Sequence, residues 1–277
     1  MNLVIDGIRF YLNVSQGDNP PLLLLHGFTG DHTTWLPFYD SWGKQAKIYG
    51  IDIIGHGKSD KPDKTEFYGI TLAASHLKKI LDRLEIEKTD LLGYSMGGRL
   101  AMTFAVLYPE MVNRLILEST SPGLKTEEER ISRKMQDEKL AHFIRQKGIA
   151  AFVDYWSDIR LFQSQKQLPV SKQEALRRQR LQNNSLGLMN SLLAMGTGSQ
   201  PSWWDALGKI TARTLLITGS LDNKFCLIAE EMSKEINNVE WRVVENCGHA
   251  IHMEESEKFA TIVSDFLSKY ERGGDNL

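Results

Sequence analysis

A serine stands between two glycines in the stretch Gly93-Tyr94-Ser95-Met96-Gly97. The residues before it, Asp90-Leu91-Leu92, continue an apolar run that predicts a strand, and residues 98–108 carry apolar side chains at helical spacing. A serine on a sharp turn between a strand and a helix is typical of a nucleophile elbow, in which small neighbours leave its hydroxyl exposed. Because the five-residue pattern also occurs in ordinary turns, the strand and helix around it carry the prediction.

A serine hydroxyl becomes a useful nucleophile or base only when a histidine accepts its proton, and a carboxylate must orient that histidine. Asp222 follows an expected strand at 214–218, and His249 follows a strand that we expect to end at Val244. When a serine lies on a nucleophile elbow, the acid and the histidine follow it in that order along the chain, in loops after later strands. We therefore predict that Ser95, Asp222 and His249 form a catalytic triad.

Such a triad needs hydrogen-bond donors for the negative oxygen that develops during the reaction. The backbone N–H groups of Phe28 and Met96 are the predicted oxyanion hole. Phe28 lies in a glycine-bracketed loop after an apolar strand, and Met96 directly follows the serine. Each group would therefore reach the same end of the sheet as Ser95.

Other histidines compete for the role of base. His252 lies three residues after His249, but Gly248 favours His249 because the base must reach the pocket from a flexible turn. His26 and His56 both lie in glycine-rich loops, where we expect them to shape the loop through hydrogen bonds rather than to act chemically.

The rest of the chain alternates between expected strands and helices. A hairpin of edge strands at 3–5 and 9–14 is followed by strands at 22–25, 48–53, 112–117, 214–218 and 241–244, and by helices at 72–84, 228–236 and 259–270. This alternation predicts an α/β protein with a mostly parallel central sheet and helices on both faces. Residues 272–277 are expected to form a polar tail.

No apolar strand is evident between residues 124 and 207, where the sequence is charged and helical in period. We expect a helical cap at 123–207, inserted into a core made of 1–122 and 208–277. Ligand sites in open α/β sheets lie beyond the carboxyl ends of the strands, so an insertion after a strand could be a lid over the site. A solvated insertion that merely covers the sheet is the alternative.

Composition excludes several classes of protein. The formal net charge of −2 and the lack of a basic run argue against nucleic-acid binding. The two cysteines are too few for a disulfide framework, and no cysteine or histidine spacing suggests a metal site. Without a leader-like start or a long apolar run, the expectation is a soluble cytoplasmic protein that does not bind membranes.

The loop at His26-Gly27, the segment Asp52–Ser59, the serine elbow, Asp222 and His249 together resemble the α/β-hydrolase superfamily over nearly the whole chain. This fold hosts many reactions, so other residues must indicate which one applies. A serine at the elbow argues against a resemblance to haloalkane dehalogenases and epoxide hydrolases, whose nucleophile is an aspartate.

Arg99 stands one turn into the helix after the elbow, where its guanidinium could bind a carboxylate at two points. A solvated surface arginine is the alternative. With Arg133 and Arg180 in the expected cap, the chain resembles the 2-succinyl-6-hydroxy-2,4-cyclohexadiene-1-carboxylate synthases of menaquinone biosynthesis. The resemblance implies that these three arginines bind a substrate with several carboxylates, and Arg130 is the alternative to Arg133.

The same resemblance implies that Tyr94 and Trp156 line the pocket. It also implies a lyase that eliminates pyruvate from 2-succinyl-5-enolpyruvyl-6-hydroxy-3-cyclohexene-1-carboxylate, with Ser95, His249 and Asp222 working as a base and with no metal or organic cofactor. The oligomeric expectation is a monomer or a small homo-oligomer. A serine hydrolase of small esters or carbon–carbon bonds, and a non-catalytic receptor on the same fold, remain alternatives.

Overall fold

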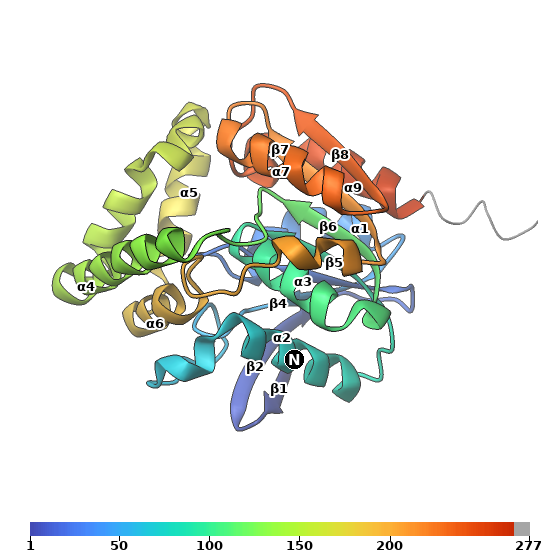
Figure 1. The fold of residues 1–277 in the computed structure, drawn as a ribbon, viewed down its shortest axis with the longest axis horizontal. Helices are drawn as coiled ribbons and strands as arrows, with labels where there is room; N and C mark the ends of the chain where they lie inside the picture. Colours follow the sequence, from blue (N-terminus) through green and yellow to red (C-terminus); the bar gives the residue numbers. More distant parts are fainter. Residues whose placement is uncertain (269–277) are drawn as a thin grey trace, which may run out of the picture.

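In the computed structural model, which describes residues 1–268, eight strands form a single sheet (Figure 1). The strands are β1 (Asn2–Ile5), β2 (Ile8–Val14), β3 (Pro21–Leu25), β4 (Lys47–Ile51), β5 (Thr89–Tyr94), β6 (Val112–Glu118), β7 (Arg213–Gly219) and β8 (Val239–Val244). Their order is β1-β2-β4-β3-β5-β6-β7-β8, and every pair from β4 to β8 is parallel. The predicted mostly parallel sheet is confirmed.

The first hairpin differs from the prediction in one respect. Strands β1 and β2 pair antiparallel, as expected, but β2 also pairs antiparallel with β4 and so is not an edge strand. Strands β1 and β8 lie at the edges of the sheet. Alternation in the sequence predicts a strand but does not say which neighbour it pairs with.

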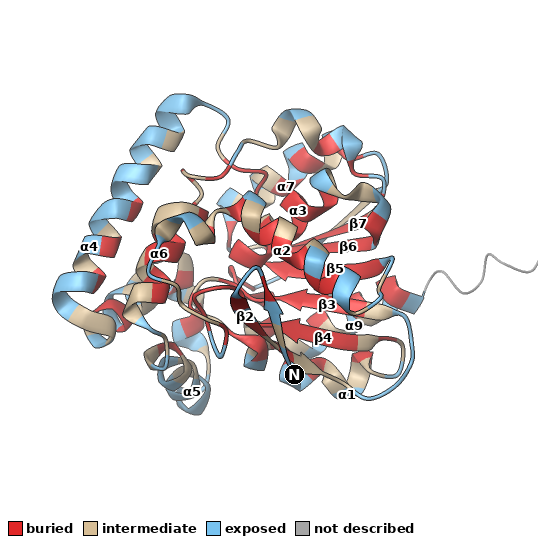
Figure 2. Ribbon diagram, turned by 90° about the horizontal axis from the view of Figure 1, so that it is seen from below, coloured by how far each residue is buried: buried red, intermediate tan, exposed pale blue. Residues whose placement is uncertain are grey.

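Strand β3 shows why the sheet needs helices on both sides. Leu22 and Leu24 pack into one hydrophobic cluster, whereas Leu23 and Leu25 pack into the other. An uninterrupted apolar run therefore supplies apolar side chains to both faces of the sheet, as a parallel strand covered on both sides requires. Figure 2 shows the buried residues concentrated along these central strands.

The helices of the core form two layers. They are α1 (Tyr39–Trp42), α2 (Ile70–Arg83), α3 (Met96–Leu107), α7 (Asn223–Glu235), α8 (Ile251–Glu254) and α9 (Ser256–Ser268), with 3₁₀ helices at His32–Phe38, Thr65–Tyr68, Pro109–Met111 and Trp204–Lys209. Buried residues of α2, α3 and α7 belong to one cluster, and those of α1, α8 and α9 belong to the other. The last two residues of the expected helix at 259–270, and the expected tail at 272–277, lie outside the described residues.

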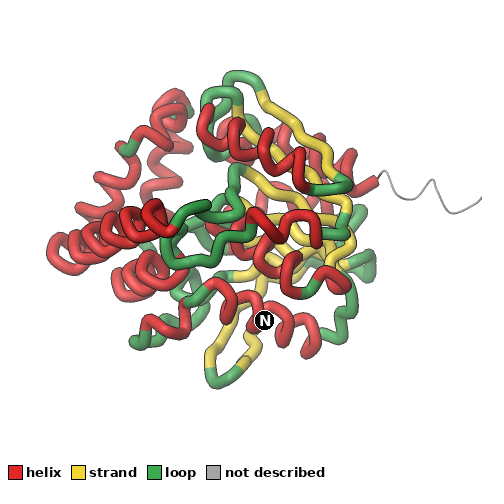
Figure 3. Tube along the Cα trace, in the orientation of Figure 1, coloured by secondary structure: helices red, strands yellow, loops and turns green. Residues whose placement is uncertain are grey.

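The segment between β6 and β7 contains helices and no strand. Its elements are α4 (Glu127–Asp158), a 3₁₀ helix (Arg160–Gln167), α5 (Val170–Leu181) and α6 (Ser185–Met195), which lie together beside the sheet (Figures 1 and 3). Thr126 and Glu129 form a capping box that begins α4, and Gly148 bends this helix with a φ of 77°. A small hydrophobic cluster of their own, including Phe152 and Leu188, holds these helices together.

No helix within residues 1–268 is both long enough and apolar enough to cross a lipid bilayer.

Candidate active site

Ser95 occupies a strained turn between β5 and α3. Its backbone has φ 49° and ψ −105°, and its N–H group donates to the carbonyl oxygen of Glu118 at 2.9 Å. A Cβ atom at Gly97 would lie 2.2 Å from the carbonyl oxygen of Leu25, and one at Gly93 would lie 2.4 Å from the carbonyl oxygen of Gly97. Because backbone atoms create both collisions, only glycine fits on either side of the serine.

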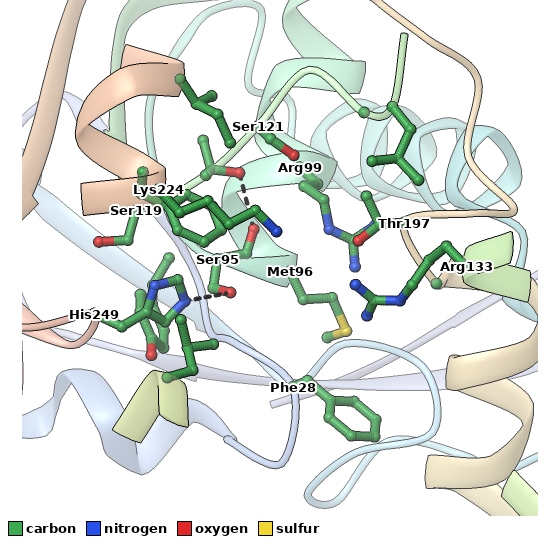
Figure 4. Close-up of a pocket in the computed structure, with 18 of the residues that line it drawn as sticks. Phe28, Ser95, Met96, Arg99, Ser119, Ser121, Arg133, Thr197, Lys224 and His249 are labelled. Carbon is green, nitrogen blue, oxygen red and sulfur yellow. Dashed lines mark hydrogen bonds between the residues drawn. The ribbon is translucent and has the colours of Figure 1, made fainter. Parts of the chain in front are cut away.

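The three residues of the predicted triad meet at the carboxyl ends of their strands. His249 Nε2 lies 3.0 Å from Ser95 Oγ, and His249 Nδ1 lies 2.7 Å from Asp222 Oδ2 (Figure 4). The carboxylate favours the tautomer that carries its proton on Nδ1, which leaves Nε2 free to accept the hydroxyl proton. This geometry can turn Ser95 into a base or a nucleophile, and the catalytic roles stay a prediction.

The other histidines are engaged elsewhere. His252 Nδ1 lies 2.9 Å from both carboxylate oxygens of Glu118, so its ring is held away from Ser95 by a buried pair of its own. His26 Nε2 accepts a hydrogen bond from a backbone N–H group at 3.0 Å. Burial lowers the pKa of His26, and it lowers the pKa of His56 to about 3, so both rings are neutral and brace their loops.

A cavity of about 720 Å³ opens in front of Ser95, between the sheet and the cap helices. Most residues predicted for the site lie in its wall, as Figure 4 shows in part. They are Phe28, Tyr94, Ser95, Met96, Arg99, Arg133, Trp156 and His249. The N–H group of Met96 lies in the first turn of α3, where helix geometry leaves it without an intrahelical partner. A developing oxyanion beside Ser95 would face this helix terminus.

Two guanidinium groups point toward one another across this cavity (Figure 4). Arg99 Nη1 donates to the carbonyl oxygen of Met195 and to Gln200 Oε1, both at 2.6 Å, and Arg133 Nε donates to Asp137 Oδ1 at 2.9 Å. Burial and the charge of Arg133 lower the pKa of Arg99 to about 9, so Arg99 is still cationic at neutral pH. Each of these two guanidinium groups bonds to the protein through one nitrogen, and its other nitrogens make no hydrogen bond within residues 1–268.

The two remaining arginines lie elsewhere. Arg130 Nη1 donates to two backbone carbonyl oxygens at 3.2 Å, so it braces the start of α4 while Arg133 enters the cavity. Arg180 is buried behind Phe162, with its guanidinium carbon 5.0 Å from the ring centroid, and it donates to Ser157 Oγ and Gln165 Oε1. It borders a separate hollow of only about 20 Å³. The structure therefore leaves Arg180 outside the main cavity.

Sequence reasoning missed four charged groups in the wall, which are Lys125, Glu129, Lys224 and Glu231. Lys224 is the second residue of α7, two residues after Asp222, and its side chain enters the cavity (Figure 4). The signal was present in the order Asp222-Asn223-Lys224, because a residue in the first turn after the acid lies on the same edge of the sheet. Ser121, from the loop after β6, and Thr197, from the loop after α6, add hydroxyl groups to the same wall.

Within residues 1–268, the one group of three side chains close enough to share a metal ion is Asp31, His32 and Asp52. These side chains already make hydrogen bonds with one another and with the backbone of their loop. Asp52 Oδ1 accepts from the His32 N–H group at 2.6 Å and lies 2.8 Å from its Nδ1, and Asp31 Oδ1 accepts from the Thr33 N–H group at 2.8 Å. These contacts fit a structural role for the group.

Comparison with known proteins places this geometry in a family. The profile of the alpha/beta hydrolase fold matches residues 20–256. A Bacillus subtilis (strain 168) protein provisionally named 2-succinyl-6-hydroxy-2,4-cyclohexadiene-1-carboxylate synthase is 45% identical over 267 residues, which cover 96% of this chain and 97% of that protein. The synthase of the same name from Salmonella arizonae is 31% identical and covers 86% of this chain and 90% of its own.

Solved structures agree. MenH from S. aureus superposes with a TM-score of 0.89 and 34% identity, covering 94% of this chain and 98% of its own. The enol-lactonase from Burkholderia xenovorans LB400, at 20% identity and a TM-score of 0.83, shares the fold alone. The chain therefore belongs to the α/β-hydrolase family and, within it, to the 2-succinyl-6-hydroxy-2,4-cyclohexadiene-1-carboxylate synthases.

Proposed function

We propose that this chain is a lyase that eliminates pyruvate from 2-succinyl-5-enolpyruvyl-6-hydroxy-3-cyclohexene-1-carboxylate, in menaquinone biosynthesis. One observation carries the proposal: a hydrogen-bonded serine, histidine and aspartate share a cavity with the guanidinium groups of Arg99 and Arg133. The near full-length similarity to named synthases supports it. We place the enzyme in the cytoplasm, as a monomer or a small homo-oligomer.

The structures of the two compounds define the bonds that change. The substrate has a ring double bond between C3 and C4 and an enolpyruvyl ether on C5, whereas the product has double bonds at C2 and C4. A proton must therefore leave C2, and the bond between C5 and the ether oxygen must break, with no water added. C2 carries the succinyl ketone, which makes its proton acidic. The task for the protein is proton abstraction followed by loss of a leaving group.

The triad performs this task without a covalent intermediate. Ser95 Oγ takes the C2 proton as its own hydroxyl proton passes to His249 Nε2, and Asp222 stabilises the resulting imidazolium. Negative charge moves onto the ketone oxygen, where the N–H groups of Phe28 and Met96 stabilise it. The electrons then return through the ring and break the C5–oxygen bond. His249 donates its proton to the departing enolate, which becomes pyruvate, and the triad is restored.

The cations position the substrate for these steps. It carries three carboxylates, and the free edges of Arg99 and Arg133 can bind carboxylates at two points. The buried indole Nε1 of Trp156 has no hydrogen-bond partner within residues 1–268, so it offers one more donor in the wall. Contact with Arg180 would require Phe162 to move aside, so this arginine is a ligand only of a rearranged cap. Tyr94 contributes its ring to the wall beside His249, with centroids 5.5 Å apart.

The test generates the enolpyruvyl substrate enzymatically and adds the purified protein. Pyruvate is followed with lactate dehydrogenase, and p-nitrophenyl acetate is assayed in parallel. We expect pyruvate release in equal amount to substrate consumed, with ester hydrolysis far slower. Pyruvate release at the rate seen without protein would overturn the proposal. Rapid ester turnover in that case would identify a serine hydrolase, and no turnover of either compound would favour a receptor.

A further inference from the structure

Lys224 is a cation that faces the cavity without a partner. Its Nζ makes no hydrogen bond or ion pair within residues 1–268, and its one aromatic contact is the ring of Phe225, whose centroid lies 5.5 Å away. The neighbouring cations differ, because Arg133 is paired with Asp137 and Lys125 with Glu231. Lys224 approaches from the core, whereas Arg133 approaches from cap helix α4 (Figure 4).

The charges of this wall repel one another. The Lys224 residue is partly exposed, and the partial burial of its ammonium lowers its pKa, as does the charge of Arg133. Arg133 acts in the same way on Arg99. Asp222 opposes the effect on Lys224, but its carboxylate is bound to His249. Glu129 and Glu231 also line the cavity, but Glu129 accepts from the Thr126 N–H group and Glu231 is paired with Lys125. An anion that enters between Arg99, Arg133 and Lys224 would relieve the repulsion among these three cations.

The position of Lys224 relates it to the reacting atoms. It lies two residues after Asp222, and the ring of Phe225 beside it lies 4.6 Å from the ring of His249, measured between centroids. An ammonium is a compact donor on a flexible stem, which suits contact with one carboxylate oxygen rather than a two-point grip. An anion held there would lie beside the triad and opposite the cap arginine.

We propose that Lys224 is a specificity-determining residue that binds a substrate carboxylate from the core side, so that this carboxylate bridges α7 and the cap arginine Arg133. The inference rests on the proposed function, which supplies a substrate with three carboxylates. It adds a ligand from the core to the arginine set, and the bridge links substrate binding to the packing of the cap on the sheet.

The test compares Lys224→Gln and Lys224→Arg with Lys234→Gln in the assay of pyruvate release. Lys234 is a matched control because it lies on the same helix, outside the cavity, paired with Glu230 at 3.0 Å. We expect Lys224→Gln to lower kcat/KM by about ten- to hundredfold, mainly through KM, as loss of a charged hydrogen bond predicts. Lys224→Arg should restore most of the loss, and Lys234→Gln should match the wild type.

A second measurement separates substrate binding from an effect on the triad. A neutral fluorophosphonate that labels Ser95 should react with Lys224→Gln at the wild-type rate, and the acidic limb of the kcat/KM profile should not move. Labelling that falls in parallel with pyruvate release would overturn the proposal, because Lys224 would then act through Asp222. Wild-type kcat/KM in Lys224→Gln would overturn it as well.

A binding measurement tests the carboxylate site separately from the proposed reaction. If the wild-type protein releases no pyruvate, citrate serves as a tricarboxylate probe in calorimetric titrations of the wild type and Lys224→Gln. Binding at least tenfold weaker in the variant would support the carboxylate site independently of the reaction. Equal affinities would overturn the inference.

Discussion

Arg99 enters the cavity from α3, one turn after Ser95. Its hydrogen bonds to the Met195 carbonyl and to Gln200 fix one edge of the guanidinium. A substrate carboxylate would therefore meet an oriented group and lose little freedom to side-chain ordering. The same helix aims its N-terminus at the predicted oxyanion, so α3 serves binding and charge stabilisation together.

Replacing Arg99 tests this role. We expect Arg99→Ala to lower kcat/KM for pyruvate release by about a hundredfold, because it removes a charged, two-point contact. Arg99→Lys retains the charge but loses the planar fork, so it should recover only part of that loss. Steady-state kinetics measure both variants. Labelling of Ser95 by a neutral fluorophosphonate is the control, and equal losses in labelling and in pyruvate release would indicate damage to the elbow instead.

His56 makes the stability of the folded protein depend on pH, independently of the reaction. Its native pKa of about 3 lies below the ordinary value of 6.5 because the ring is buried. Between these values the unfolded chain binds a proton that the native protein does not, so stability falls as the pH falls through 6.5. The loss from this group reaches about 2 kcal/mol at pH 5.

Urea denaturation at pH 7, 6 and 5 measures this effect. His56→Gln cannot take up the proton, so its free energy of unfolding should vary less steeply with pH, by about one proton between pH 6 and 5. Identical slopes in the two proteins would contradict the assignment of a neutral, buried His56.

The positions of some site residues could be predicted from the sequence, and those of others could not. Ser95, Asp222 and His249 were predictable because each follows a strand, and parallel strands bring such loops to one edge of the sheet. Arg180 depends instead on how α5 packs, and no periodicity reveals that Phe162 separates it from the cavity. Lys224 could have been predicted, because the first turn of the helix after Asp222 lies at the same edge of the sheet as the acid.

Among the elements, the turn from β5 to α3 has the least tolerance for change. Gly93 and Gly97 allow the chain to bring Ser95 against the end of β3, where the backbone of Leu25 leaves no room for a methyl group. The cap helices are held differently, by apolar contacts and by polar contacts such as Asn183 Nδ2 with the Thr29 carbonyl at 2.8 Å. The site thus lies between a turn that is fixed by backbone contacts and cap helices that are held in place by side-chain contacts.

Gly97→Ala tests the turn. The added methyl would lie 2.2 Å from the Leu25 carbonyl oxygen, so we expect a loss of more than about 2 kcal/mol in the free energy of unfolding, with slow labelling of Ser95. Gly208→Ala is the matched control, because its nearest atom would be the Glu235 carbonyl oxygen at 3.8 Å. Chemical denaturation of both variants gives the comparison. Equal stability of the two would mean that the turn is not as crowded as described.

The elements themselves were largely predictable. Runs such as Leu22–Leu25 indicate buried strands, and the charged, strand-free stretch before Leu207 indicates helices. Strand pairing was harder to predict from the sequence. Strand β2 is an example, because packing of the whole sheet brings its partner β4 beside it. The kink of α4 at Gly148 was likewise invisible, since a single glycine inside a helical pattern does not say how the helix bends.

An almost neutral chain lines the cavity between the core and the cap with four cations, Arg99, Lys125, Arg133 and Lys224, and with two carboxylates, Glu129 and Glu231. Arg99 and Lys224 come from the core, and Arg133 comes from the cap. An anionic substrate would therefore be attracted to the cavity and would draw its two sides together, which also excludes water from the reacting atoms. Selectivity for polycarboxylates follows from this distribution of charge rather than from the triad, which many hydrolases share.

Ionic strength tests the electrostatic part. Raising salt from 0.05 M to 0.5 M should increase KM for the enolpyruvyl substrate by roughly three- to tenfold, because screening weakens its attraction to the cations. The rate constant kcat should change little, since the bound carboxylates are shielded from salt. Labelling of Ser95 by the neutral fluorophosphonate should not depend on salt. A KM insensitive to salt would show that charge does not govern substrate capture.

Ser95 is the base that starts the proposed elimination. The direct measurement is the rate of pyruvate release by Ser95→Ala beside the wild type, with Ser233→Ala, a half-buried serine of α7 outside the cavity, as the control. We predict a loss of at least about a thousandfold for Ser95→Ala and none for the control. Release by Ser95→Ala within a few-fold of the wild-type rate would contradict the account.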